Sequence, residues 1–317
     1  MHNPTFVFTR LSERSQYYGG KKYSTEEVQK VANQIRKQIL GVALQTGGCY
    51  LAQACSSAEI IASLYTKVMN LGPSVGNWEP IPFPGVPGPD NMDYQRGSAY
   101  NGAPAPDKDR FFVSCCHYAS VIYSALAATG RISPNCMEKF NVDGWNMEMI
   151  GAEHSPGFEN TAGSLGQTIS IAGGTAHARK RRGDTGKCYV LLGDGELQEG
   201  QTWECIQAAG HYKLDNFIVV VDANDQQVEG KIADQMTEEP IVARFESFGA
   251  TCVECNGHDI EAFCKAFETP HEGRPLVVIA RTSGATGIKP LEKPRSMHFI
   301  RIGKDERDEF QKIYDAM

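Results

Sequence analysis

The sequence predicts an α/β fold in which a parallel sheet is sandwiched between helices. Short apolar runs recur in the second part of the chain and alternate with segments of helical periodicity. Strands that are apolar throughout are typical of parallel sheets, because helices cover both faces of such a sheet. The runs expected to form strands are 111–114, 188–192, 217–222, 250–254 and 276–280.

Helices are also expected outside the strand-rich part. Ser24-Thr25-Glu26-Glu27 is a capping box, and apolar residues follow it at helical spacing as far as Val42. A second helix is expected to start at Ser56, after a turn of small residues at 46–50. A helix is expected at 118–129, before Gly130, and another starts at Ser133-Pro134, which form a cap and a first-turn proline. Further helices are expected between the second and third strands, at about 259–267 and near the end of the chain.

The segment 70–109 breaks this pattern. It is irregular and rich in glycine, and it holds prolines 73, 80, 82, 84, 87, 89, 104 and 106. A long irregular segment within a compact domain is usually a functional loop or a linker. Trp78, Phe83 and Tyr94 could pin it to a surface, so we expect an ordered, lid-like insertion in a single domain spanning 1–317.

Composition and charge exclude several kinds of partner. With 41% apolar and 22% charged residues, the chain has the composition of a globular protein with a core. The formal net charge of −7 argues against binding to nucleic acid or to an anionic membrane. The sequence has no run of 18 apolar residues that could span a membrane and no apolar signal core at the N-terminus. The ten cysteines are not spaced as in small disulfide-bonded domains. We therefore expect a cytoplasmic protein.

Two further motifs favour ordinary structural explanations. The basic run 179–182 precedes Gly183 and fits the last turn of a helix, where positive charge complements the helix dipole, better than a binding patch. Cys252 and Cys255 form one CxxC motif, but zinc needs four ligands and no second pair has matching spacing.

The strongest functional signal is Gly193-Asp194-Gly195-Glu196, directly after an apolar strand. Ligands of open parallel sheets bind beyond the carboxyl ends of the strands. Glycines on both sides of the aspartate allow a sharp turn and a close approach of the backbone to a phosphate, and the following helix offers its N-terminal N–H groups. Asp194 would repel a bare phosphate, so a bridging cation is expected.

A second oxygen donor follows the next strand. Asn224 lies thirty residues beyond Asp194, in the sequence Asp222-Ala223-Asn224-Asp225-Gln226. Carboxylate, amide and carbonyl oxygens together with phosphate oxygens suit Mg²⁺ or Ca²⁺. A GDG motif followed at this spacing by an asparagine predicts a metal–diphosphate site.

These motifs resemble the diphosphate-binding signature of transketolases. The similarity covers roughly 24–69 and 110–300 and includes GDGELQEGQTWE, KLDNFIVVVDAN, DRFFVSCCHYASVIYSALAATG and Gly163-Ser164-Leu165-Gly166-Gln167. The resemblance implies the thiamine diphosphate-binding fold. It also implies that Asp194 and Asn224 bind a divalent metal through their side chains, that Gln226 binds it through its backbone carbonyl, and that Gly195 donates its N–H to the diphosphate.

The resemblance assigns five further residues to the cofactor and substrate. Gly163 and Leu165 would lie against the aminopyrimidine ring of the cofactor, and Glu199 would couple to a partner glutamate that protonates this ring. His117 and His298 would flank the diphosphate and the substrate hydroxyls. The alternatives are a glutamate in a helix first turn for Glu199 and a histidine in a cap region for His117.

The chain departs from the family at the substrate. Transketolases carry a histidine in a Ser-Gly-His turn, where this chain has Thr46-Gly47-Gly48-Cys49-Tyr50. Another family histidine falls on Met149, and His154 could replace it only if the loop is reshaped. His258, in Asn256-Gly257-His258-Asp259, fits a turn at a helix start better than the site. These losses put the usual sugar-phosphate donors in doubt.

The resemblance also implies a partner. The acid that activates the aminopyrimidine sits on a second domain in transketolases, and this sequence ends at Met317, after the diphosphate-binding domain. We therefore expect the N-terminal subunit of a split transketolase-like enzyme, paired with a C-terminal subunit, with two copies of each. It would transfer a two-carbon ketol unit between a ketose-type donor and an aldehyde.

Two other functions stay open. One is a 2-oxo acid decarboxylating E1-like or acyloin-forming subunit, although GDGELQEG stands where such a subunit has a serine-bearing loop. The other is a non-catalytic regulatory module, against which the intact Asp194, Asn224, Glu199 and His117 argue.

Overall fold

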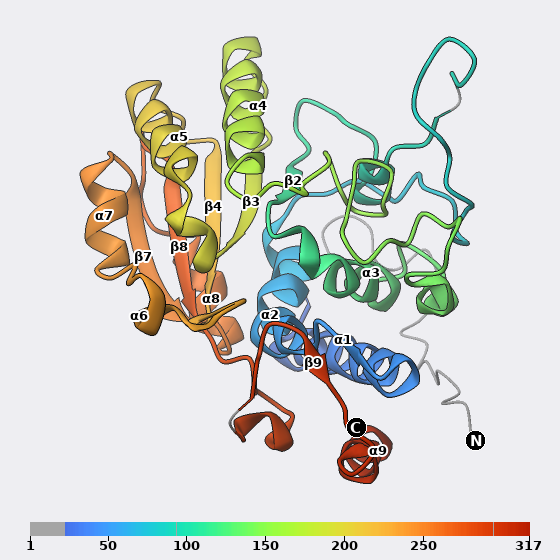
Figure 1. Ribbon diagram of the computed structural model, residues 1–317. Helices are drawn as coiled ribbons and strands as arrows, with labels where there is room; N and C mark the ends of the chain where they lie inside the picture. Colours follow the sequence, from blue (N-terminus) through green and yellow to red (C-terminus); the bar gives the residue numbers. More distant parts are fainter. Residues whose placement is uncertain (1–22, 93, 294) are drawn as a thin grey trace.

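A five-stranded parallel sheet forms the centre of the computed structural model, which describes residues 23–92, 94–293 and 295–317 (Figure 1). The strand order is β2-β3-β4-β8-β7, and every neighbouring pair is parallel. The predicted α/β fold is thereby confirmed, with each strand within two residues of its expected position. The strands are β2 (Arg110–Val113), β3 (Cys188–Gly193), β4 (Phe217–Ala223), β7 (Thr251–Asn256) and β8 (Leu276–Arg281).

Helices cover both faces of this sheet (Figure 1). Successive strand residues point to opposite faces, so Leu191 packs in one core cluster and Val190 in the other. The first cluster contains α1 (Thr25–Thr46), α2 (Leu51–Ser63), α3 (Ala119–Ala128) and α8 (Ile260–Ala266), and the second contains α4 (Thr168–Arg182), α5 (Gly200–His211) and α7 (Ile241–Ser247).

The first two helices match the sequence signals unequally. The capping box of α1 is confirmed, because the Glu27 N–H donates to Ser24 Oγ and the Ser24 N–H to Glu27 Oε2. The prediction that the second helix starts at Ser56 is wrong, since α2 begins at Leu51 and Ser56 lies inside it. The turn before α2 is shorter than expected because β1 (Gly48–Cys49) pairs with β9 (Ile300–Arg301).

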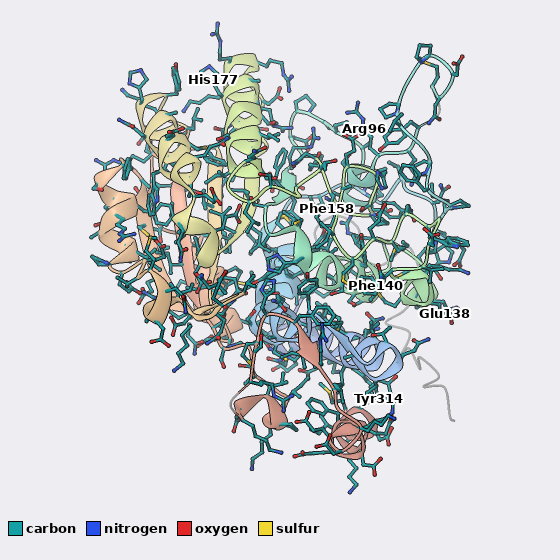
Figure 2. The ribbon with its side chains drawn as sticks, viewed as in Figure 1. Arg96, Glu138, Phe140, Phe158, His177 and Tyr314 are labelled. Carbon is teal, nitrogen blue, oxygen red and sulfur yellow. The ribbon has the colours of Figure 1, made fainter. Side chains whose placement is uncertain are left out.

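Other predicted helices are present with altered lengths. Gly130, with φ +68°, follows α3 as expected, and Ser133 caps a short 3₁₀ helix over Pro134–Lys139. The terminal helix α9 (Arg307–Ala316) packs back on α1, where Lys37 Nζ lies 5.2 Å from the centre of the Tyr314 ring (Figure 2). The remaining elements are β5 (Gln226–Gln227), β6 (Gly230–Lys231), α6 (Ile232–Gln235), the π-helical turn Leu64–Val68, and the 3₁₀ helices Gly97–Asn101, Cys116–Tyr118, Gly195–Gln198 and Lys289–Glu292.

The segment 70–109 is anchored to the rest of the chain by buried polar groups. Arg131 donates from its guanidinium to the carbonyl oxygens of Gly72 and Tyr100, each at 3.0 Å. Tyr100 is fully buried, whereas Phe83, one of the expected anchors, is exposed. The tip of the segment also exposes apolar side chains, with Met92 at 83% exposure. Tyr100 and Arg131 are therefore buried anchors of the described part of the insertion, whereas Phe83 contacts the ring of His154 from an exposed position.

The basic run and the cysteine pair both have structural roles. Arg179 is buried and donates to three backbone carbonyls of the segment 70–109, while Lys180 and Arg182 pair with Asp215 and Asp184. Arg179, Lys180 and Arg182 therefore interact within the fold rather than forming a binding patch.

The CxxC pair cannot share a metal ion. Cys252 and Cys255 lie three positions apart on β7, and they pack against the two core clusters on opposite faces of the sheet. Within the described residues, no group of three or more His, Cys, Asp or Glu side chains could hold a metal, and no helix is long and apolar enough to cross a membrane.

Candidate functional site

A cavity of about 270 Å³ lies at the carboxyl ends of β3 and β4. This edge is where an open parallel sheet binds ligands. The cavity brings together most of the residues that the sequence singled out, although they come from distant parts of the chain. Those in its lining are His117, Leu165, Asp194, Gly195, Glu199, Asn224, Gln226 and His298.

The carboxylate of Asp194 connects the two strand ends. It accepts from the Gly195 N–H at 2.9 Å and from the Asp225 N–H at 2.5 Å. Asp225 has φ +59°, a left-handed conformation that aspartate tolerates better than most residues. This conformation turns the chain after β4 so that its backbone faces Asp194. The Gln226 N–H then donates to Asn224 Oδ1 at 3.0 Å.

The charges of the cavity suit a divalent cation. Asp194, Glu196, Glu199 and Glu229 line it, and in the described part of the chain no lysine or arginine does. Burial, with the neighbouring Asp222, raises the pKa of Asp194 to about 8. A cation beside Asp194 would supply the missing positive charge and stabilise the carboxylate. The oxygen donors of Asp194, Asn224 and Gln226 fit a hard ion such as Mg²⁺ or Ca²⁺.

The turn 163–166 packs against the helix that follows the GDG motif. Gly166 has φ +77°, and a Cβ atom there would lie 2.6 Å from the Cβ of Glu199, so only glycine fits. The turn brings Leu165 into the cavity lining, but Gly163 is exposed and does not line the cavity. Of the two residues assigned to the aminopyrimidine, the structure places only Leu165 in the cavity.

His117 and His298 meet at one side of the cavity. Their ring centres are 5.0 Å apart. His298 is brought here by the β1–β9 pair and by Gln53, whose Nε2 donates to the His298 carbonyl oxygen at 3.0 Å. Burial, followed by the proximity of His298, lowers the pKa of His117 to about 3, and burial also lowers the pKa of His298. Both rings are therefore neutral at neutral pH and suit hydrogen bonds to hydroxyl or carbonyl groups.

Comparisons with known proteins identify the family of the chain. Residues 95–316 match the family described as transketolase, thiamine diphosphate binding domain. The chain belongs to this family. A transketolase family protein of Sinorhizobium fredii is 34% identical over 289 residues, which cover 90% of this chain and 94% of that protein. One subunit of an apulose-4-phosphate transketolase of Actinobacillus succinogenes is 31% identical over 296 residues, which cover 92% of this chain and 98% of that subunit.

Solved transketolases share the fold. The structure of the Campylobacter jejuni transketolase superposes with a TM-score of 0.75 at 25% identity, over 92% of this chain and 43% of that one. The chain thus spans less than half the length of that transketolase, whereas it spans nearly all of the two shorter relatives.

The departures from the transketolase pattern are visible beside the cavity. Tyr50 occupies the altered turn, and its ring centre lies 5.4 Å from both the His117 and the His298 ring centres. His154 does not line the cavity. It pairs instead with Glu148 and packs against the ring of Phe83. The suggestion that His154 replaces a missing site histidine therefore has no support in its position.

His258 also lies outside the cavity, as expected. Its Nδ1 is 3.0 Å from Glu59 Oε2, and Glu59 forms a buried ion pair with Arg36. Burial alone would raise the pKa of Glu59, but the bonds from His258 and Arg36 lower it to about 2. This network joins α1, α2 and the turn after β7, which is a structural role.

Sequence reasoning missed several polar residues at the cavity. Glu196 is buried, accepts from the Gly166 N–H at 2.6 Å and from Ser114 Oγ, and has a pKa raised to about 7, chiefly by burial. Glu196 Oε2 and Gln53 Oε1 are buried and have no hydrogen-bond partner among the described residues. Glu196 stands inside the GDGE motif and could have been found, whereas Gln53 carries no signal in the sequence.

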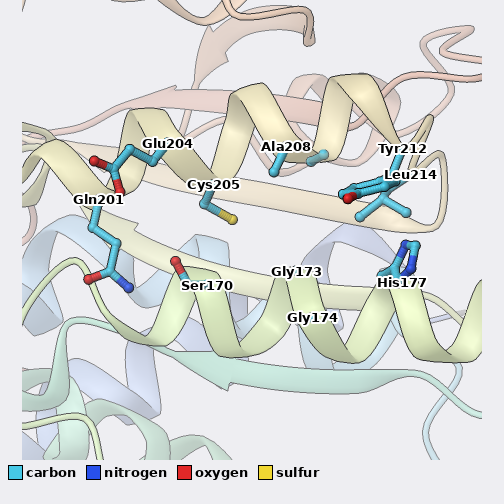
Figure 3. Close-up of a pocket in the computed structure, with 11 residues that line it drawn as sticks. Ser170, Gly173, Gly174, His177, Gln201, Glu204, Cys205, Ala208, Tyr212 and Leu214 are labelled. Atoms are coloured by element: carbon cyan, nitrogen blue, oxygen red, sulfur yellow. The ribbon is translucent and has the colours of Figure 1, made fainter.

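A second cavity, of about 370 Å³, lies between α4 and α5 (Figure 3). His177 and Tyr212 close one end of it, with ring centres 4.6 Å apart, and Ser170 and Gln201 stand toward the other (Figure 3). None of the predicted site residues lines it. Although this cavity is larger, the chemistry of the GDG and Asn224 motifs lies at the other one.

The low pKa of His117 predicts how stability depends on pH. Below a pH of about 6.5 the histidine is protonated in the unfolded chain, but it stays neutral in the folded one. The unfolded state then binds more protons, so the free energy of unfolding falls as the pH drops below 6.5. Between pH 6 and 5, the free energy of unfolding of His117→Gln should therefore fall by about 1 kcal/mol less per pH unit than that of wild type.

Urea unfolding of the full chain from pH 7.5 to 5, without added metal or cofactor, measures this difference. His211→Gln, at an exposed position, is the control. Parallel pH profiles for His117→Gln and wild type would contradict the prediction.

Proposed function

We propose that this chain is the cofactor-binding subunit of a thiamine diphosphate-dependent transketolase-like enzyme. It transfers a two-carbon ketol unit from a ketose-type donor to an aldehyde acceptor. The observation that carries the proposal is the meeting of Asp194, Gly195, Asn224 and Gln226 in a cavity whose described lining has no lysine or arginine. An anionic diphosphate can bind among these carboxylates only together with a cation.

The chain's own residues would hold the cofactor in defined places. The side chains of Asp194 and Asn224 and the backbone carbonyl of Gln226 would bind Mg²⁺ or Ca²⁺, and the Gly195 N–H would donate to the diphosphate. Leu165, which lines the cavity, would lie against the aminopyrimidine. When bound, thiamine diphosphate supplies a carbanion and an electron sink for cleavage of a carbon–carbon bond.

Three side chains would act on proton positions and on the substrate. Glu199 is exposed at the cavity edge, at the N-cap of α5, where a second polypeptide can reach it. It would hydrogen-bond the partner acid that protonates the aminopyrimidine. The neutral His117 and His298 would bind the hydroxyl and carbonyl oxygens of the donor.

The partner would be a C-terminal transketolase-like subunit, with two copies of each chain in the assembly. The relative from Actinobacillus succinogenes is named as one subunit of its enzyme, and this chain covers 98% of its length. That a protein of this length is named as a subunit supports a division of the enzyme between two polypeptides. The proposal of two copies of each rests on the symmetry usual for soluble oligomers.

Two alternatives make different demands. A 2-oxo acid decarboxylating subunit would release carbon dioxide from a 2-oxo acid and deliver the remaining fragment to a lipoyl domain. A regulatory module would have no need for Asp194, Asn224, Glu199 and His117 in one cavity, yet all four lie there. Assays for carbon dioxide release and for metal-dependent cofactor binding separate these alternatives from ketol transfer.

Cofactor binding is expected to require a divalent cation. Without it, Asp194 would repel the diphosphate by about 4 kcal/mol for unit charges 4 Å apart near a protein surface. Calorimetry of thiamine diphosphate binding to the assembled enzyme, with and without Mg²⁺, measures this requirement. Asp194→Ala should abolish both binding and activity while leaving the circular dichroism spectrum unchanged. Equal affinity after chelation would refute the metal assignment.

Ketol transfer is expected to need the partner subunit. The purified chain should show no turnover. Activity should appear, and saturate at a one-to-one ratio, on titration with the C-terminal subunit. The reason is that the acid opposite Glu199 must come from outside this domain. Full turnover by the chain alone would overturn the split-enzyme proposal.

Xylulose 5-phosphate is expected to be a poor donor for the assembled enzyme. Tyr50 stands in the altered turn, Met149 is packed against the core, and His154 is absent from the cavity lining. Each lost histidine contact would weaken donor binding by roughly 0.5–1.5 kcal/mol. Two losses together would lower turnover about tenfold to a hundredfold.

A panel of donors under saturating acceptor tests this expectation. It should include apulose 4-phosphate, which the name of the Actinobacillus relative suggests, and other modified ketoses. If xylulose 5-phosphate gives the highest kcat/KM of the panel, the substrate argument is wrong, while the cofactor and partner proposals stand.

A further inference from the structure

Asp222 is a buried carboxylate held by hydroxyl groups from three other parts of the chain. Its side chain is fully buried at the end of β4, and it forms no ion pair with a described residue. Ser56 Oγ in α2 and the Tyr118 hydroxyl before α3 each donate to Asp222 Oδ2 at 2.6 Å. Thr282 Oγ1, just after β8, donates to Oδ1. A carboxyl group buried in this way is stabilised by the donors aimed at it, and these donors fix its position.

The fourth donor to this carboxylate is the amide of Asn224. Asn224 Nδ2 lies 3.2 Å from Asp222 Oδ2 and 3.2 Å from the Tyr118 hydroxyl oxygen. The other end of the amide, Oδ1, accepts from the Gln226 N–H, and Asn224 is one of the residues that line the cavity. The Asn224 amide is therefore held at both ends: its nitrogen donates to Asp222, and its oxygen accepts from the Gln226 N–H.

An asparagine side chain has two nearly isosteric orientations, one with oxygen and one with nitrogen toward a given point. Only the oxygen can bind a cation. If the amide turned over, its oxygen would face the Asp222 carboxylate and its NH₂ group would face the Gln226 N–H, so both pairs would repel. The Asp222 carboxyl group, whose oxygens accept from three hydroxyl groups, thus makes the flipped state unfavourable.

We propose that Asp222 is a positioning residue that fixes the Asn224 amide with its oxygen toward the metal of the cofactor. The proposal rests on the metal site proposed above, and it adds a role for a residue that touches neither metal nor cofactor. Residues that orient a metal ligand in this way commonly change metal affinity by about 10–100-fold when they are replaced.

The test exchanges the two side chains. Asp222→Asn removes the acceptor oxygen that orients the amide, and we expect the affinity for Mn²⁺ in the presence of thiamine diphosphate to fall about 10–100-fold. The double variant Asp222→Asn, Asn224→Asp keeps the net charge and nearly the same volume. A carboxylate at position 224 can turn either oxygen toward the metal, so it needs no neighbour to orient it. The Mn²⁺ affinity of the double variant should therefore return to within about threefold of the wild-type value.

Mn²⁺ affinity is read from the electron paramagnetic resonance signal of free Mn²⁺ during titration of the full chain in complex with its partner. Two controls vary the surroundings of Asp222. Ser56→Ala removes one donor to Asp222 but leaves the contact to Asn224, so Mn²⁺ affinity should stay near wild type. Tyr118→Phe removes the hydroxyl shared by both residues and should give a smaller loss than Asp222→Asn. Thermal unfolding without metal reports any general loss of stability.

The outcomes separate this inference from the proposed function. Wild-type Mn²⁺ affinity in Asp222→Asn, or a double variant no tighter than the single one, overturns the positioning role alone. If wild type shows no thiamine diphosphate-dependent Mn²⁺ binding, or Asp194→Ala binds as tightly as wild type, the metal site itself is wrong. A Ser56→Ala loss as large as that of Asp222→Asn would indicate general disruption of the core rather than orientation of Asn224.

Discussion

A hydrogen bond from the Asp225 N–H to the Asp194 carboxylate joins the ends of the two central strands. It can form because β3 and β4 run parallel in a register that pairs Gly193 with Asp222, so both chains turn at the same edge of the sheet. A slip of one residue would exchange the faces of β4 and move Asp222 out of its pocket of hydroxyl groups. The packing of the sheet and the geometry of the candidate site are therefore specified by the same apolar pattern.

The fold places carboxylates and two histidines in the cavity and leaves its described lining without lysine or arginine. Four carboxylates and two neutral histidines cannot by themselves attract an anionic ligand. This arrangement is consistent with a site in which a bound metal ion supplies the positive charge.

The sheet could be predicted from the sequence because apolar strands are a local signal. The same holds for the meeting of Asp194 and Asn224 in one cavity, because each follows a predicted strand and one helix separates these strands. The start of α2 could not be predicted, since it depends on the pairing of Gly48–Cys49 with the distant strand Ile300–Arg301. Gln53 and Tyr50 enter the site through the same long-range pairing, which leaves no periodic signal in the chain.

The two ends of the candidate site therefore depend on different parts of the structure. The proposed cofactor end is built from turns at the ends of β3 and β4, where the side chains of Asp194 and Asn224 accept from backbone N–H groups. The proposed substrate end is built from side chains on α2, on the turn before α3 and beside β9, whose identity the backbone does not dictate. Tyr50 can stand among His117 and His298 without any change in the turn that holds Asp194. A chain of this family can accordingly retain the cofactor chemistry while its substrate preference changes, because the residues that differ from the family pattern are those least constrained by the sheet.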